Sequence, residues 1–222
     1  MTNLSEFTFL SSDGKTQLHG MLWEPEGVAV RAVLQICHGV AEHIARYDGF
    51  ARALNEQGIV VAGHDHLGHG KSLPEGGTPV YFGEGNTWNT VVDDIYILHQ
   101  RLKQRYPDVP LCIMGHSMGS FLTRTYLIRY PGTVKAAVIM GTGWQPQADP
   151  LCGADATVGL FRQMLHGIRF NQRQSHLRQM DREMPVLFVA GDKDPVGNCG
   201  KGVRQTYDAF RQAGMRDCTL KL

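Results

Sequence analysis

The sequence has no long hydrophobic run and no excess of charge of one sign. Its longest apolar stretches, such as residues 58–63, are far shorter than the about 20 residues that a membrane-spanning helix needs. The 22 Lys and Arg residues are balanced by 21 Asp and Glu residues, so the formal net charge is +1. Proteins that bind nucleic acid usually carry a basic stripe. We therefore expect neither a membrane-embedded protein nor one that binds nucleic acid.

The sequence also lacks the cysteine patterns of a disulfide framework or a zinc site. Its five cysteines are scattered, odd in number and never in a CxxC spacing. The N-terminal residues, 1–7, lack the basic and apolar segments of a signal peptide. We therefore expect a cytoplasmic protein whose cysteines are mostly small buried hydrophobes.

Short apolar segments alternate with helical ones along most of the 222 residues, a length that fits one α/β domain. A hairpin is predicted from residues 6–10 and 17–23, and further strands at 31–37, 59–62, 111–114, 136–140 and 186–190. This alternation predicts a mostly parallel sheet with helices on both faces. Residues 1–140 and 184–222 form the predicted core, and residues 141–183 are predicted to be a lid inserted above the sheet.

The segment Gly115-His116-Ser117-Met118-Gly119 lies directly between a predicted strand and a predicted helix. This context makes a GxSxG motif informative, because a sharp turn there exposes the serine hydroxyl at the carboxyl end of the sheet. Side chains at either glycine would collide with the neighbouring strand and helix. The helix dipole also favours negative charge that develops at Ser117. We predict that Ser117 is the nucleophile of an acyl transfer.

A loop after the strand that ends at Cys37 is predicted to complete an oxyanion hole. The predicted donors are the backbone N–H groups of Val40 and Met118, and His38 is expected to hold the loop rather than to carry a proton. Substrate contacts are expected from His38, Gly39 and His116 near the nucleophile and from Phe161, Met164 and Leu165 of the lid. The apolar lid residues either line an acyl tunnel or pack the lid onto the sheet domain.

Two further motifs follow predicted strands. Asp194 comes after the strand at 186–190, where the order of triad residues in such a fold places the acid, with Asp192 as the alternative. The segment His64-Asp65-His66-Leu-Gly-His69 has a spacing that metal ligands use. We expect these groups to bond the backbone of a turn instead, because no further ligand cluster accompanies them. No metal or cofactor is expected.

Three segments together resemble one family. They are His38-Gly-Val-Ala-Glu-His-Ile-Ala-Arg-Tyr47, Asp65-His-Leu-Gly-His-Gly-Lys-Ser72 and Gly115-His-Ser-Met-Gly119. They resemble the monoacylglycerol lipase and lysophospholipase group of α/β-hydrolases, also described as serine aminopeptidase S33-like, over about residues 7–222. The resemblance implies an α/β-hydrolase fold, with Ser117 as nucleophile, Asp194 as triad acid and Val40 and Met118 as oxyanion donors. It also implies hydrolysis of a carboxylic ester of a single-chain lipid, and we expect transient contact of the lid with a membrane surface.

The sequence departs from that group in two places. The group has a histidine after the triad acid, whereas the last of the ten histidines here is His176. Because serine at its free pKa is a poor nucleophile, we expect the catalytic histidine to lie beyond Leu222. Relatives also have a longer lid, so we expect part of it to be missing near residues 144–149.

Two other functions stay open. One is an aminopeptidase or acyltransferase on the same triad, in which Glu42 would hold a substrate amine. The other is a non-catalytic binding protein with a hydrolase fold. The sequence does not choose between a monoacylglycerol and a lysophospholipid as the lipid.

Overall fold

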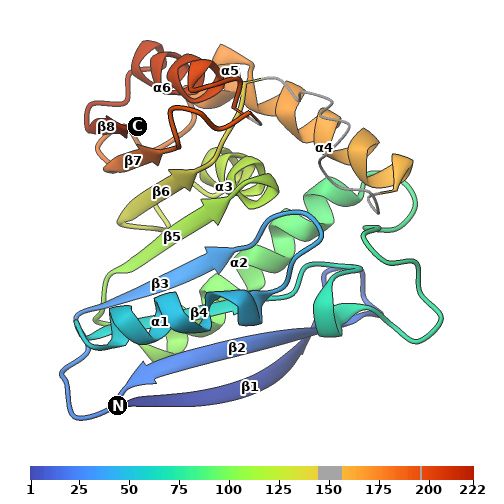
Figure 1. The fold of residues 1–222 in the computed structure, drawn as a ribbon, viewed down its shortest axis with the longest axis vertical. Coiled ribbons are helices and arrows are strands. Elements are labelled where there is room, and N and C mark those ends of the chain that lie inside the picture. Colours follow the sequence, from blue (N-terminus) through green and yellow to red (C-terminus); the bar gives the residue numbers. More distant parts are fainter. Residues whose placement is uncertain (145–156, 196) are drawn as a thin grey trace.

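The computed structural model describes residues 1–144, 157–195 and 197–222 (Figure 1). Within these ranges eight strands form one sheet in the order β1-β2-β4-β3-β5-β6-β7-β8. The strands are β1 (Thr2–Leu10), β2 (Gln17–Pro25), β3 (Ala32–Cys37), β4 (Ile59–His64), β5 (Leu111–His116), β6 (Ala136–Met140), β7 (Val186–Val189) and β8 (Cys218–Lys221). The helices are α1 (Asp48–Asn55), α2 (Thr87–Arg105), α3 (Met118–Arg129), α4 (Val158–Asn171), α5 (Gln174–Leu177) and α6 (Lys201–Gln212).

The sheet is mostly parallel, as predicted. Strand β1 pairs antiparallel with β2, and β2 pairs antiparallel with β4, whereas every other neighbouring pair is parallel. Because parallel strands end at the same edge of a sheet, the loops after β3, β4, β5, β6 and β7 gather at one edge. The predicted site residues outside the lid lie at the ends of β3, β5 and β7 or directly after them.

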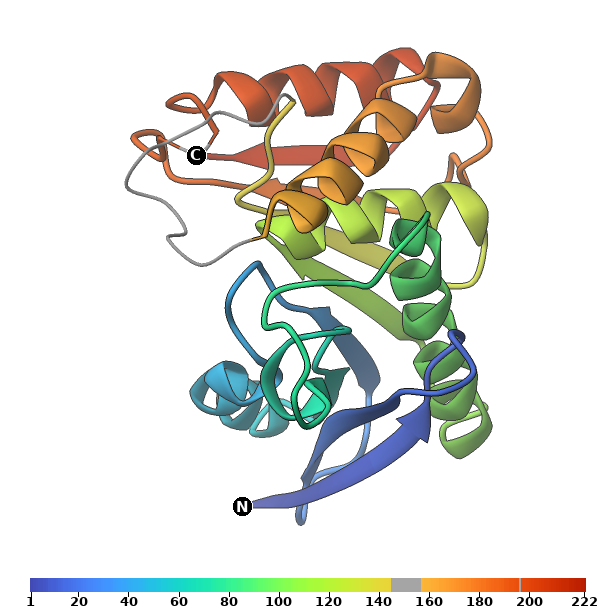
Figure 2. The same cartoon turned by 90° about the vertical axis from the view of Figure 1, so that its right-hand side faces the viewer.

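Helices cover both faces of the sheet (Figure 2). Helix α1 lies on one face, over a small apolar cluster that includes Trp23, Ile36 and Val61. Helices α2, α3 and α6 contribute to a larger cluster on the other face. The alternation along β3 explains the division, because Ile36 faces α1 while Gln35 points the other way and donates to the Ile95 carbonyl of α2 at 2.8 Å.

Helix α3 has no solvent-facing residue over most of its length, since residues 118–128 are all buried. Its first residues approach the sheet closely because Gly119 has no side chain. A Cβ built on Gly119 would overlap the Cys37 carbonyl and would lie 2.6 Å from the His38 carbonyl oxygen. A Cβ on Gly115 would likewise overlap the Gly119 carbonyl and the Thr123 hydroxyl.

The predicted insertion contributes α4, which packs against α3 and α2. Thr157 begins this helix by accepting the Leu160 N–H at 3.1 Å, and Gly167 allows contact with the Trp88 indole. Of the apolar residues of α4, Leu160, Met164 and Ile168 are buried and pack the helix onto the core, whereas Val158, Phe161 and Leu165 are exposed. Apart from Trp144, the predicted break at 144–149 lies outside the described residues, as does Cys152.

Across the described ranges, no helix combines the length and the apolar character that crossing a bilayer would require.

Candidate active site

Ser117 lies on a strained turn between β5 and α3. Its φ of +52° and ψ of −120° are dihedrals that residues other than glycine rarely adopt. The conformation costs about 1–3 kcal/mol and persists where the surrounding structure holds it. Here the Ser117 N–H donates to the Met140 carbonyl at 3.0 Å, and the Ser117 carbonyl accepts the Ser120 N–H at 2.8 Å. The strain is therefore built into the junction of β5, β6 and α3.

The loop after β3 packs directly against this turn. A Cβ built on Gly39 would lie 3.2 Å from the Ser117 Cβ and 2.8 Å from the Glu42 Oε1, so the loop needs glycine at this position. Val40 follows Gly39 and is half-buried, whereas Met118 is buried at the first position of α3. Of the two residues predicted as oxyanion donors, Val40 thus lies in the loop that packs against Ser117 and Met118 begins the helix that follows it.

Glu42 joins these two segments, a role that the sequence reasoning missed. Its buried carboxylate accepts the Gly39 N–H, the Tyr47 hydroxyl at 3.0 Å and the His116 Nδ1–H at 3.1 Å, and pairs with Arg46 at 3.0 Å. Burial alone would raise the pKa of Glu42, but the hydrogen bonds, that from His116 foremost, outweigh it and lower the pKa to about 2. The carboxylate is therefore ionised and fully engaged, which disfavours the amine-binding role considered for it.

His38 is part of the fold beneath the loop rather than part of its surface. The ring is fully buried, its Nδ1–H donates to the Gly39 carbonyl at 2.8 Å, and its Nε2 accepts the His66 N–H at 3.0 Å. Burial, with repulsion from His69, lowers the pKa of His38 to about 4, so the ring is neutral at pH 7. Both ring nitrogens of His38 bond the backbone, so the ring is not available to contact a substrate, contrary to that expectation. His38 instead holds the loop, which was the other expectation for it.

Four buried histidines, at positions 38, 64, 66 and 69, form a cluster under this loop. The ring centroid of His66 lies 4.1 Å from that of His38, 5.0 Å from that of His64 and 6.5 Å from that of His69. Among the described residues, neither ring nitrogen of His64 or of His66 has a hydrogen-bond partner. Burial lowers the pKa of every member, that of His64 to about 3 and that of His66 well below its ordinary value. The cluster is thus stable only as neutral rings.

The backbone-bonding role predicted for the turn after β4 holds for Asp65 and His69 but not for His64. Asp65 accepts the Ile44 N–H at 2.7 Å and the Lys71 N–H at 2.9 Å, and the His69 Nδ1–H donates to the Leu67 carbonyl at 2.9 Å. No set of three or more His, Cys, Asp or Glu side chains in the described parts of the chain is arranged to hold a metal ion.

Asp194 lies beside the Ser117 turn, in the loop after β7. A Cβ built on Gly141 would lie 3.9 Å from the Asp194 Oδ2 and 3.8 Å from the His116 Nε2, so both side chains approach the carboxyl end of β6. The Cys199 N–H donates to the Asp194 carbonyl at 2.9 Å and closes the loop. Asp194 is half-buried, whereas the alternative acid Asp192 is exposed. The geometry therefore favours Asp194 as the carboxylate near the nucleophile.

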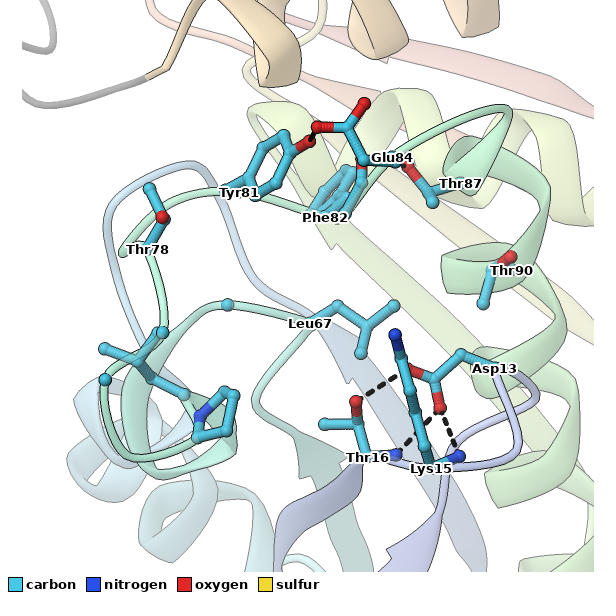
Figure 3. Close-up of a pocket in the computed structure, with 16 residues that line it drawn as sticks. Asp13, Lys15, Thr16, Leu67, Thr78, Tyr81, Phe82, Glu84, Thr87 and Thr90 are labelled. Carbon is cyan, nitrogen blue, oxygen red and sulfur yellow. Dashed lines mark hydrogen bonds between the residues drawn. The ribbon is translucent and has the colours of Figure 1, made fainter.

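A cavity of about 600 Å³ lies apart from these residues (Figure 3). Its walls come from the β1–β2 turn, the loop after β4, which includes Leu67, and the beginning of α2. Asp13 holds the turn by accepting the Lys15 and Thr16 N–H groups at 2.8 Å. A second hollow, of about 300 Å³, adjoins it under α4. None of the predicted site residues lines either cavity.

The chain is similar in sequence to known proteins. Residues 28–148 match the family described as "Serine aminopeptidase, S33". The chain is 33% identical to the monoacylglycerol lipase of Mycolicibacterium smegmatis over 89% of its own length and 66% of that protein. It is 34% identical to a monoglyceride lipase homolog of monkeypox virus over 57% of its length and 41% of that protein.

A solved structure, that of a thermostable carboxyl esterase from Bacillus coagulans in complex with glycerol, is similar over 98% of this chain and 89% of its own, with a TM-score of 0.87 and 22% identity. The likeness extends over the sheet and helices that position Ser117. The chain spans between about two fifths and two thirds of the length of the two curated relatives above.

Proposed function

Because this chain belongs to the serine aminopeptidase S33 family and has the α/β-hydrolase fold, we propose that it is a serine hydrolase that cleaves the ester of a single-chain lipid such as a monoacylglycerol. The observation that carries the proposal is the strained Ser117 turn, at the beginning of a helix buried over residues 118–128 and in contact with the Gly39 loop. The curated relatives that are monoglyceride lipases support the substrate class.

In the proposed mechanism the Ser117 hydroxyl attacks the ester carbonyl and forms a tetrahedral intermediate. The backbone N–H groups of Val40 and Met118 stabilise its oxyanion, and the dipole of α3 adds to this. The alcohol then leaves, and water hydrolyses the acyl-enzyme. Glu42 contributes indirectly, because it bonds both Gly39 and His116 and so couples the oxyanion loop to the turn that carries Ser117.

Attack requires a base for the Ser117 proton, and an acid that orients this base. We propose Asp194 for the acid, since its carboxylate approaches the same end of β6 as His116. In the family resemblance the base is a histidine that follows the acid, whereas here the last histidine of the sequence is His176. Reactivity of Ser117 toward an activated electrophile is therefore the decisive property to measure.

For the lid we propose residues 141–183, whose described helices are α4 and α5. Val158, Phe161 and Leu165 are spaced three and four residues apart on one face of α4, and all three are exposed. A face of this kind, with Arg162 and Arg169 on the same helix, suits transient contact with the surface of a lipid aggregate. The buried Met164 instead holds α4 on the core.

The test is intact-mass analysis of the expressed protein before and after treatment with a fluorophosphonate. We expect one adduct on the wild type, none on Ser117→Ala, and one on Ser175→Ala, a matched control at an exposed serine of α5. Hydrolysis of a monoacylglycerol series should follow the same pattern. Absence of an adduct on the wild type would refute the serine hydrolase, and cleavage of arylamides in preference to esters would indicate a peptidase.

A further inference from the structure

Arg124 is a fully buried cation in the middle of α3. Its side chain is among the largest of the molecule to be completely enclosed. Within the described ranges no carboxylate pairs with the guanidinium, and its Nε and Nη2 have no hydrogen-bond partner. Burial alone lowers its pKa from 12.5 to about 9. An arginine in this state is unusual, since buried charges are normally paired.

The single strong bond of Arg124 reaches the loop after β6. Its Nη1 donates to the Gly143 carbonyl at 3.0 Å and lies 3.5 Å from the Thr142 hydroxyl. The guanidinium carbon also lies 5.7 Å from the centre of the Phe121 ring, one turn earlier on α3. Arg124 therefore connects the helix that begins after Ser117 to residues 142–143.

This loop is the surface on which the Asp194 loop rests. A Cβ built on Gly197 of that loop would lie 3.4 Å from the Thr142 carbonyl oxygen, and one on Gly202, in the first turn of α6, would lie 2.9 Å from the Gly143 Cα. Residues 142–143 thus contact the Asp194 loop at Gly197 and helix α6 at Gly202, in both places through backbone atoms. A shift of residues 142–143 is transmitted directly to the segment that carries Asp194.

Stability does not account for Arg124. Moving an unpaired cation into the interior costs several kcal/mol, and an apolar side chain of similar size often stabilises such a site. The Gly143 carbonyl also has a second donor within reach, because the Thr206 hydroxyl lies 3.4 Å away while it now donates to the Gly202 carbonyl at 2.9 Å. Removal of Arg124 therefore leaves no buried acceptor that must stay unpaired.

We propose that Arg124 is a positioning residue for the acyl-transfer site, which holds the loop under Asp194 at a set distance from the helix that begins after Ser117. The inference rests on the proposed function. In this proposal Arg124 lowers the stability of the fold but improves the geometry of the acyl-transfer site. Active sites commonly contain residues that favour activity at the expense of stability.

The test compares Arg124→Met with Thr206→Val, a matched variant that keeps the Arg124 bond to Gly143. Three quantities are measured for each: the melting temperature, kcat and KM on a monoacyl ester, and the rate of fluorophosphonate labelling. We expect Arg124→Met to melt at or above the wild-type temperature and to lose about 10- to 100-fold in kcat with KM within about twofold, since a small misplacement of catalytic groups costs rates of this size. Thr206→Val should keep kcat within about threefold.

Two results would overturn the inference. One is an Arg124→Met protein with wild-type kcat and labelling rate. The other is a parallel loss of kcat and melting temperature, or failure to fold, which would make Arg124 a purely structural residue. A wild type that is not labelled at all refutes the proposed function itself, and with it the inference, so the two failures are distinguishable.

Discussion

The buried histidine cluster predicts that acid destabilises this protein through specific residues, and His64 is the clearest case. It ends β4, is fully buried, and packs its ring against Phe9 with centroids 5.3 Å apart. Burial, followed by repulsion from His38, lowers its pKa from 6.5 to about 3, while the neighbouring Asp65 acts in the opposite direction. The folded protein therefore keeps His64 neutral at pH values where the unfolded chain protonates it.

The sign and size of the effect follow from proton linkage. A lowered pKa in the folded state gives stability that is complete above pH 6.5 and is lost as the pH falls toward 3, because the unfolded state binds more protons in that window. Between pH 7.5 and 5, His64 alone should reduce the free energy of unfolding by about 2 kcal/mol. In a domain of this size that corresponds to about 4–8 °C in melting temperature.

The test is His64→Leu, followed by thermal unfolding at pH 7.5 and pH 5. The melting temperature of this variant should fall by about 4–8 °C less than that of the wild type over the same interval. At pH 7.5 we expect no loss of stability, since an apolar side chain replaces a ring with two unpaired nitrogens. His43→Gln, at an exposed histidine, is the matched control and should behave as the wild type. Equal pH dependence in His64→Leu and the wild type would refute the reasoning.

Four further substitutions test other contacts. Glu42→Gln weakens the link between the Gly39 loop and the Ser117 turn, because an amide cannot accept all the hydrogen bonds of the carboxylate. If the proposed function holds, kcat in an ester assay should fall about tenfold or more, and an unchanged kcat would count against this role. Gly119→Ala places a Cβ on the Cys37 carbonyl and should cost about 3 kcal/mol or prevent folding, as measured by urea unfolding. Gly167→Ala places a Cβ on the Trp88 ring and should lower the free energy of unfolding by about 1–3 kcal/mol. Gly49→Ala, in a helix with open space around the Cβ, should raise it by about 0.5–1 kcal/mol. Changes of the same sign in the two variants would contradict this packing.

Much of the fold was predictable because the local signals agree with the tertiary structure. The strand at 136–140 was predicted with its exact bounds, and the helices before Pro107 and Pro131 end where the residues before proline should leave the helix. The predicted strand at 111–114 was too short. Strand β5 continues through His116, because Gly115 and His116 pair with Ile139 and Met140 of β6. A pairing partner of this kind is invisible in a local pattern.

The site was predictable only where a motif implies its own geometry. The strand–turn–helix context of Ser117 and the position of Asp194 after a strand could both be read from the sequence. The role of Glu42 could not, because its carboxylate acts on Gly39, three residues earlier, and on His116, 74 residues later. Arg124 reads as an ordinary helical arginine until the structure encloses it. Burial of a charged residue depends on what other segments cover it, and periodicity does not report this.

The enclosure of residues 118–128 links the lifetime of the helix that follows Ser117 to that of the whole molecule. Peptide groups without a solvent-facing side open mainly when the entire fold opens, whereas frayed ends and surface loops open on their own. Deuterium should therefore enter this helix last. Local opening of the loops that carry Gly39 and Asp194 would leave this helix closed, so loss of protection at residues 118–128 should mark molecules that have unfolded as a whole.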